Sequence, residues 1–195
     1  MHIASIVRQT RTIARRRAAV GGAIVKWAMA AHRQHQLIAA GSRAPDFRLA
    51  RLDGGAMSLA ETIAGGPALL VFYKVTCPVC QMTLPFLERI HAGADGGGGG
   101  LRIYGISQNE AEDTREFMGE FGVTFPMLLD REEAGFPASN AYGISSVPTS
   151  FLVEPDGSIG RVIEGWQKAE IERLGALAGV AVLGAGDYVP AWKAG

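Results

Sequence analysis

Short apolar runs alternate with amphipathic stretches along most of the chain. Residues 68–73 (ALLVFY) form a continuous apolar run of strand length, as expected for a strand covered on both faces. Two further runs, 101–107 (LRIYGIS) and 125–130 (FPMLLD), have the same character. Apolar residues at helical spacing from 78 to about 91, and acidic residues early in 110–121, predict two helices.

Turn and capping signals delimit the remaining elements. Alternation of apolar and polar residues around Phe47 predicts an edge strand, and Ser58 with Glu61 has the spacing of a capping box at the start of a short helix. Residues 150–165 (SFLVEPDGSIGRVIEG) predict a hairpin around a Pro-Asp-Gly turn. Two more helices are predicted, over 139–142 and 168–177. The order of these elements predicts an α/β fold with a mixed central sheet and helices on both faces.

Formal charge divides the chain into two parts. The first 45 residues hold eight of the nineteen Lys and Arg residues and none of the nineteen acids, so they carry +8 and the rest carries −8. Such a contrast indicates separate units. We therefore predict a basic N-terminal extension (1–41), a folded domain (42–182) and a C-terminal tail (183–195).

The basic extension has features of a targeting segment. A cluster of arginines ending at Arg17 precedes an apolar stretch and the small residues around Ala28, which resemble a cleavage site, but Lys26 interrupts the apolar stretch. Three interpretations stay open: an export signal or membrane anchor, a basic amphipathic helix on a membrane, a partner or nucleic acid, and a loosely ordered extension or a start codon placed too far upstream. Membrane association is expected only through this segment, and no nucleic-acid partner is expected. The compartment stays open, with the cytoplasm slightly favoured.

The two cysteines of the chain, Cys77 and Cys80, stand where a buried strand passes into a helix. Pro78 occupies the first helical position, where its missing N–H is tolerated, so Cys77 is expected at the N-cap. There the unpaired N–H groups and the positive end of the helix dipole favour a thiolate. Cys80 follows one turn later on the same face, within disulfide reach. The spacing predicts a redox pair, with Cys77 as nucleophile and Cys80 as resolving cysteine.

Structural and metal-binding roles fit the pair less well. A structural disulfide closing so short a loop would stabilise the fold by only about 2 kcal/mol, and inert core cysteines would lie inside the strand or along the buried stripe of the helix. Zinc needs four ligands, and the other candidate pair, His32 and His35, lies in the basic extension at a spacing shorter than usual. We expect no metal and no other cofactor.

Four motifs carry a resemblance to a known family. APDFRL…LDGGAMSL is similar to an N-terminal β-hairpin, and LLVFYKVTCPVC to a strand followed by a CxxC active site. YGISQNEAEDTREFMGEFGVTFPMLLD is similar to an inserted strand, helix and strand, and ISSVPTSFLVEPDG to a cis-proline loop with its hairpin. Residues from about 42 to 180 thus resemble the thioredoxin-like superfamily, in the redoxin branch of TlpA/ResA-type oxidoreductases and AhpC/TSA-like peroxiredoxins. The resemblance implies a thioredoxin-like fold with an N-terminal β-hairpin and an inserted α-β element.

The resemblance also implies a site around the cysteines. Val147 and Pro148 would be joined by a cis peptide, in a loop that packs against the CxxC and leaves the Val147 backbone free to pair with a bound partner. The other residues implied to line the substrate groove are Thr76, Pro78, Val79 and Thr149.

The chain departs from the family pattern at two places. Thr76 replaces the tryptophan that precedes the first cysteine in thioredoxins. Val71 stands where they carry a buried acid that helps to deprotonate the second cysteine. Proton transfer must therefore come from elsewhere, and Lys74 and Glu164 are the candidates for an electrostatic or proton-carrying role.

Thr76 also bears on the reaction type. Peroxiredoxins place a threonine three residues before the peroxidatic cysteine, whereas Thr76 lies one residue before Cys77 and four before Cys80. We therefore predict a thiol-disulfide oxidoreductase that acts on protein or small-molecule thiols and disulfides, with an upstream protein as electron donor or acceptor. A thiol peroxidase and a non-catalytic binding module on the same fold are the alternatives.

Overall fold

The computed structural model describes residues 36–94 and 100–195. From Leu37 onward the chain forms one compact unit. The candidate targeting features of the basic extension and the pair His32 and His35 lie outside the described residues. Within the described ranges, no helix combines the length and the hydropathy needed to cross a membrane.

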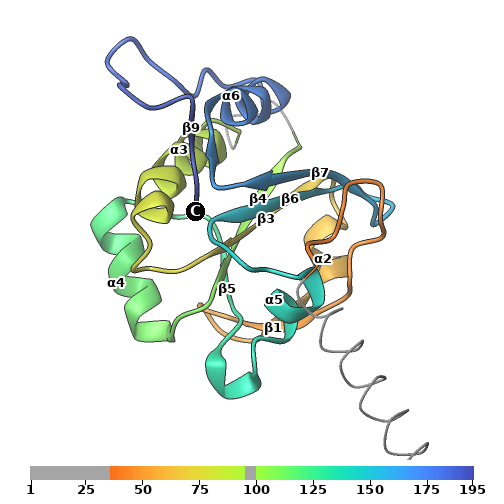
Figure 1. The fold of residues 1–195 in the computed structure, drawn as a ribbon. Helices are drawn as coiled ribbons and strands as arrows, with labels where there is room; N and C mark the ends of the chain where they lie inside the picture. Colours follow the sequence, from red (N-terminus) through yellow and green to blue (C-terminus); the bar gives the residue numbers. More distant parts are fainter. Residues whose placement is uncertain (1–35, 95–99) are drawn as a thin grey trace, which may run out of the picture. The chain divides into compact units, whose positions relative to one another are not determined.

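A mixed seven-stranded sheet forms the centre of the fold (Figure 1). Its strands are β1 (Arg48–Arg51), β2 (Ala56–Ser58), β3 (Ala68–Tyr73), β4 (Arg102–Ser107), β5 (Met127–Leu129), β6 (Thr149–Val153) and β7 (Ile159–Glu164). They lie in the order β2-β1-β5-β4-β3-β6-β7. The neighbours β3 and β4, and β4 and β5, are parallel, and the other neighbouring pairs are antiparallel. The mixed sheet predicted from the order of elements is confirmed.

Helices cover both faces of this sheet. They are α2 (Leu59–Ile63), α3 (Pro78–Ala94), α4 (Ala111–Phe121), the 3-10 helix η1 (Glu132–Ala134), α5 (Pro137–Tyr142) and α6 (Lys168–Leu177). Leu87 of α3, Phe117 of α4 and Leu174 of α6 belong to one core cluster. Leu59 of α2 and Tyr142 of α5 belong to a second cluster on the other face.

The central strand β3 shows why its sequence is continuously apolar. All six of its residues are buried. Its odd-numbered residues belong to the first core cluster and its even-numbered residues to the second. Because side chains alternate between the faces of a strand, a strand covered on both faces needs apolar residues at every position.

The N-terminal hairpin of β1 and β2 departs from the expectation in one respect. The edge-strand assignment around Phe47 is wrong, because β1 lies between β2 and β5 and it is β2 that forms the edge of the sheet. Ala50 of β1 pairs with Leu129 of β5. Alternation reports which face of a strand is buried, and it carries no information about a partner so distant in sequence.

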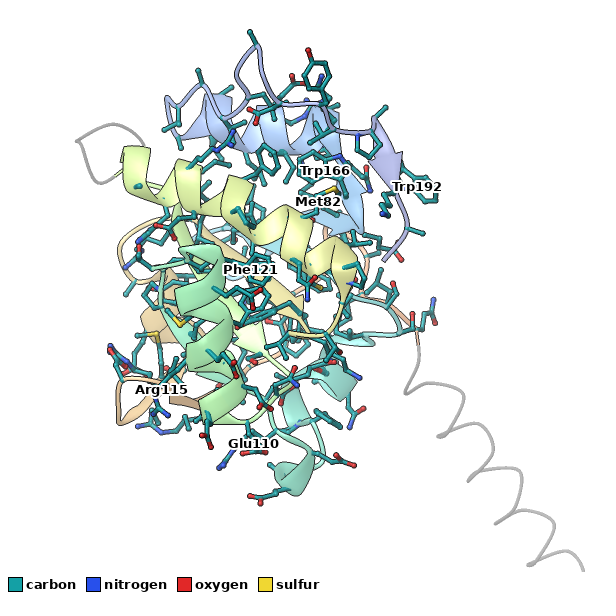
Figure 2. The ribbon with its side chains drawn as sticks, turned by 90° about the vertical axis from the view of Figure 1, so that its left-hand side faces the viewer. Met82, Glu110, Arg115, Phe121, Trp166 and Trp192 are labelled. Carbon is teal, nitrogen blue, oxygen red and sulfur yellow. The ribbon has the colours of Figure 1, made fainter. Side chains whose placement is uncertain are left out.

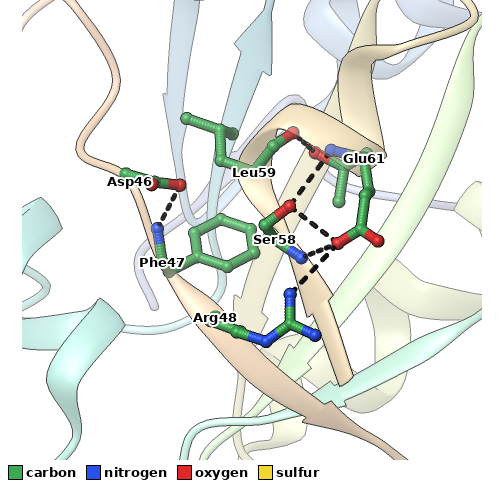
Figure 3. A network of polar contacts seen from close by, with 7 residues as sticks. Asp46, Phe47, Arg48, Ser58, Leu59 and Glu61 are labelled. Atoms are coloured by element: carbon green, nitrogen blue, oxygen red, sulfur yellow. Dashed lines mark hydrogen bonds and ion pairs between the residues drawn. The ribbon is translucent and has the colours of Figure 1, made fainter. Parts of the chain in front are cut away.

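A capping box begins α2, as predicted (Figure 3). The Glu61 backbone N–H donates to Ser58 Oγ at 3.3 Å, and the Ser58 backbone N–H donates to Glu61 Oε2 at 2.7 Å. Arg48 Nη1 of β1 lies 3.7 Å from the same carboxylate oxygen. The capping box thus pairs the Glu61 N–H of the first helical turn with an acceptor, and Arg48 links the box to the hairpin.

The C-terminal part of the domain adds a second, smaller sheet. After β7, the strand β8 (Trp166–Gln167) pairs antiparallel with β9 (Trp192–Lys193). The residues after α6 therefore return along the domain and meet the segment that precedes α6.

Candidate active site

The junction between β3 and α3 places the two cysteines. The strand ends at Tyr73, a short turn follows, and the helix begins at Pro78. The Cys77 backbone N–H donates to Lys74 O at 3.2 Å, and Cys77 O accepts from Gln81 N at 3.0 Å, the first hydrogen bond of the helix ladder. These bonds put Cys77 at the N-cap position, as the proline at the next residue predicts.

The sulfur of Cys77 takes the part that an oxygen plays in an ordinary N-cap. The Cys80 backbone N–H, three residues on, donates to Cys77 Sγ at 3.4 Å. An N-cap side chain normally accepts from this same position of the first turn. The start of the helix therefore directs a hydrogen-bond donor, together with the positive end of its dipole, at the sulfur.

The two thiols differ in exposure. Cys77 is partly exposed, whereas Cys80 is fully buried in the first core cluster. Burial raises the pKa of the Cys80 thiol, because the apolar surroundings disfavour its thiolate. The sulfur of Cys77 is therefore accessible to a partner in solution, whereas the buried sulfur of Cys80 stays protonated as a thiol.

The loop before β6 lies against Cys77. The peptide between Val147 and Pro148 is cis, as the resemblance implies. Cys77 Sγ donates to Val147 O at 3.2 Å across 70 residues of sequence. Thr149 Oγ1 donates to Ser146 O at 2.8 Å and closes the loop. The structure therefore brings together the nucleophile and the proline loop.

The other predicted site residues are distributed unevenly around this centre. Thr76 and Pro78 are exposed beside Cys77, whereas Val79 is buried and packs into the core. Lys74 is exposed and contributes its backbone carbonyl to the turn. Glu164 is exposed at the end of β7, opposite Thr149 in the ladder. The side chains of Lys74 and Glu164 are thus placed in solvent.

Two residues that support the turn were not anticipated from the sequence. Asn109 Oδ1 accepts from Val75 N at 3.0 Å, and Gln81 Nε2 donates to Val75 O at 2.9 Å. Both backbone groups of Val75 are thus held by side chains, one from α3 and one from the connection between β4 and α4. Gln81 lies four residues after Cys77, a helical spacing that offers some signal, but Asn109 has none.

A buried tyrosine lies behind the cysteines. Tyr73, the last residue of β3, shares the first core cluster with Cys80. Its hydroxyl donates to Met127 Sδ at 3.3 Å. Burial raises the pKa of Tyr73 to about 12, partly offset by hydrogen bonding to Ser107. The hydroxyl therefore stays protonated at neutral pH.

A metal centre is not suggested by the surroundings of the pair. Within residues 36–94 and 100–195, no group of three or more His, Cys, Asp or Glu side chains is arranged to hold a metal ion. His32 and His35, the other ligands that the sequence offers, lie outside those ranges.

The sequence of the chain matches a known protein family and known relatives. Residues 40–162 match the AhpC/TSA family. The thiol-disulfide oxidoreductase ResA of Geobacillus thermodenitrificans is 30% identical over 134 residues, which are 68% of this chain and 74% of the relative.

Two solved structures have a similar fold. The thioredoxin domain of a thiol-disulfide oxidoreductase from Bacteroides vulgatus superposes with a TM-score of 0.59 at 25% identity, over 66% of this chain and 91% of that one. A putative thiol:disulfide interchange protein DsbE from Chlorobium tepidum gives a TM-score of 0.62 at 24% identity, over 75% and 99%. The chain therefore belongs to the AhpC/TSA family, among the ResA-type thiol-disulfide oxidoreductases.

Proposed function

We propose that Cys77 and Cys80 carry out thiol-disulfide exchange, with Cys77 as the attacking sulfur. The Cys77 thiolate attacks one sulfur of a substrate disulfide, the substrate S–S bond breaks, and the released thiolate takes up a proton. Cys80, after losing its proton, attacks Cys77 Sγ and releases the second substrate thiol. The substrate disulfide is reduced to two thiols, and the pair is oxidised to a disulfide. The reverse sequence oxidises a dithiol.

One observation carries this assignment of roles. The N–H of Cys80 points at Cys77 Sγ from 3.4 Å at the start of α3, while Cys77 is partly exposed and Cys80 is buried. A helix N-terminus stabilises a thiolate, and exposure lets it reach a partner. The buried thiol, with its raised pKa, stays protonated until the mixed disulfide forms.

The surface around Cys77 supports a docking groove. We propose that Val147 offers its backbone to an extended partner segment and that the exposed residues Thr76 and Pro78 line the groove, while Pro148 and Thr149, which are buried, shape the loop behind it. Val79 is buried, so its contribution is to hold the first turn of α3 in place. We assign only a long-range electrostatic role to the two exposed charged candidates, Lys74 and Glu164.

The partners follow from this chemistry. Thiols and disulfides are the substrates of exchange, and the pair must be returned to its starting state by a second thiol or disulfide. We propose protein or small-molecule substrates and a redox partner protein as the donor or acceptor of electrons. The direction depends on the reduction potential of the pair.

Trapping of the mixed disulfide tests the roles. The Cys80→Ser variant should accumulate a covalent complex with a disulfide-containing protein, because nothing resolves it, and Cys77→Ser should accumulate none. A complex in Cys77→Ser, or none in either variant, contradicts the proposal. Equilibration of the wild-type pair in glutathione buffers then gives the direction, since about −270 mV indicates a reductant and about −120 mV an oxidant.

The rate of reaction with hydrogen peroxide distinguishes a thiol peroxidase from a thiol-disulfide oxidoreductase. A thiol peroxidase would lose its Cys77 thiol to hydrogen peroxide far faster than free cysteine does, as measured by stopped flow. We expect a rate near that of an ordinary thiol, because Thr76 is exposed in the turn and lies next to the cysteine rather than three residues before it.

A further inference from the structure

The last residues of the chain run past the end of the domain that carries Cys77 and the Val147–Pro148 loop. We call residues 183–195 the strap. Its first part is anchored to α3: Arg89 Nη1 donates to Asp187 Oδ2 at 2.6 Å and Nη2 to Oδ1 at 3.1 Å. Asp187 also accepts from Gly184 N at 2.7 Å. The guanidinium of Arg89 lies 4.5 Å from the centre of the Phe86 ring, which holds it in position.

The middle of the strap is attached to β8 and to the first residue of α6. Trp166 Nε1 donates to Pro190 O at 2.6 Å, and Lys168 N donates to Ala191 O at 2.9 Å. Trp192 and Lys193 then pair with Gln167 and Trp166 as β9. The strap is thereby aimed from α6 towards the beginning of α3 (Figure 1).

The last residue of the strap meets the proline loop. A Cβ on Gly195 would overlap the Val147 carbonyl oxygen and would lie 3.2 Å from Pro148 N. The same carbonyl oxygen accepts from Cys77 Sγ at 3.2 Å. Both views place this end of the chain beside the first turn of α3 (Figures 1 and 2). The strap thus lies on the backbone edge next to the nucleophile.

The outer part of the strap is weakly held. Residues 191–195 are all exposed, and β9 pairs over only two residues. Trp192 is 63% exposed and projects outward from β9 (Figure 2). Segments with little buried apolar surface and a short ladder open at a low free-energy cost. The outer part can therefore lift while the anchor at Asp187 stays in place.

We propose that the strap covers the Val147 edge on which an extended segment of a protein disulfide pairs, and that a protein substrate displaces it. This inference rests on the proposed function. Cys77 remains partly exposed beneath the strap, so a small disulfide reaches the sulfur without displacement. A protein substrate needs the backbone edge as well, because β-strand addition requires free main-chain groups. The strap thus makes exchange with proteins slower than exchange with small disulfides would suggest.

The test replaces Gly195 by leucine in the full chain. Any side chain there collides with the Val147 carbonyl and must push the strap off the loop. Gly186→Leu is the matched control, because an added Cβ at this position of the same strap meets no atom within 4 Å. Insulin serves as the protein disulfide and glutathione disulfide as the small one.

We expect Gly195→Leu to raise the rate constant for insulin reduction at least about threefold, since the apparent affinity of a partly covered site equals its intrinsic affinity multiplied by the fraction that is uncovered. The rate with glutathione disulfide should stay the same, and Gly186→Leu should match the wild type with both substrates. An equal rise with both substrates, or no rise with either, would overturn the proposal. So would a fall with insulin, since the strap would then form part of the groove.

Amide hydrogen exchange gives a readout that does not depend on turnover. The Cys80→Ser variant, joined at Cys77 to a cysteine-containing peptide, should exchange the Lys168 N–H faster than the free variant, because its acceptor Ala191 O leaves with the strap. Unchanged protection contradicts displacement. A parallel measurement of disulfide exchange by Cys77→Ser keeps the two ideas apart, since activity that persists there contradicts the proposed function itself.

Discussion

Two helix N-termini of this domain have a similar local structure but serve different purposes. In each, a buried strand precedes a helix whose first residue is proline: β3 directly precedes Pro78 of α3, and β5 precedes Pro137 of α5 with the short helix η1 between them. In each, the backbone N–H groups of the first helical turn meet a side chain that can carry negative charge. At the first junction this is Cys77, and at the second it is Asp130.

The two side chains differ in how completely they are satisfied. Asp130 is fully buried and accepts from Ala138 N at 3.0 Å, Ser139 N at 2.7 Å and Ser139 Oγ at 2.6 Å. Cys77 Sγ accepts one backbone N–H at 3.4 Å and stays partly exposed. A helix N-terminus thus fixes a structural anchor where three short bonds and burial complete it. Where the helix itself supplies only one longer bond and the sulfur keeps access to solvent, the N-terminus leaves an atom free to react.

The largest difference between the junctions should appear in activity. Replacing Cys77 by serine should lower the rate of disulfide exchange at least about a thousandfold, because the hydroxyl is no substitute for a thiolate nucleophile. The free energy of unfolding should hardly change, since serine is a favoured N-cap residue. Insulin reduction and urea unfolding measure the two quantities. Exchange above about a tenth of the wild-type rate would contradict the role of Cys77.

The second junction should show the reverse pattern. Asp130→Ala should lower the free energy of unfolding by about 3 kcal/mol, because it leaves buried N–H groups without an acceptor. The rate of exchange by the folded protein should stay near the wild-type value. Asp130→Asn, which keeps one acceptor oxygen, should lose about half as much. A loss of activity without a loss of stability would remove the contrast between the junctions.

The pH dependence of the free energy of unfolding should show that Cys80 is a buried, neutral thiol. Burial raises the pKa of Cys80, so the folded protein keeps this proton where the unfolded chain releases it. The resulting stabilisation is present below the ordinary thiol pKa of about 8.5 and is lost as the pH rises above it. Between pH 8.5 and 10, the reduced wild type should lose about 1.5 kcal/mol more than Cys80→Ala.

Tyr73 is present in both proteins, and because burial raises its pKa to about 12 it stays largely protonated over this range and contributes little to the difference. Urea unfolding of the reduced proteins at several pH values gives the two slopes. Parallel slopes would show that Cys80 is not a buried neutral thiol.

The smallest effect is expected from the two prolines. Pro78→Ala and Pro137→Ala should each lower the free energy of unfolding by about 0.5 kcal/mol, because alanine frees the unfolded chain. Only Pro78→Ala should also change the redox equilibrium. It adds an N–H donor to the first turn of α3, which stabilises the thiolate and hence the reduced pair, by about threefold in the equilibrium with glutathione. Equal redox shifts in both variants would contradict a local cause.

Much of the fold could be predicted because its signals are local. The apolar run 68–73 became β3 and the helix over 168–177 became α6 with the predicted bounds. Such patterns record which faces of a strand or helix are buried, and each is complete within a few turns or residues. The mistaken edge strand shows the limit, since the pairing of Ala50 with Leu129 depends on how the inserted strand β5 docks.

In the candidate site too, features that depend on neighbouring residues could be predicted, and features that depend on distant residues could not. The N-cap position of Cys77 follows from the proline beside it and from the helix that starts there. The two side chains that hold the turn, Gln81 and Asn109, come from different elements and could not be inferred from spacing alone. The sequence sets the strap apart only as a tail, because its exposed, short pairing leaves little trace in hydropathy.

The sequence by itself determined the order of elements, the buried central strand and the placement of two thiols at the start of a helix. Each of these depends on residues close together in the chain, whose periodicity and capping chemistry act before any distant contact forms. The tertiary structure alone decided that Val147, 70 residues from Cys77, lies against the sulfur, and that Gly195 lies against Val147. Such contacts depend on the packing of the whole sheet, which no local pattern encodes.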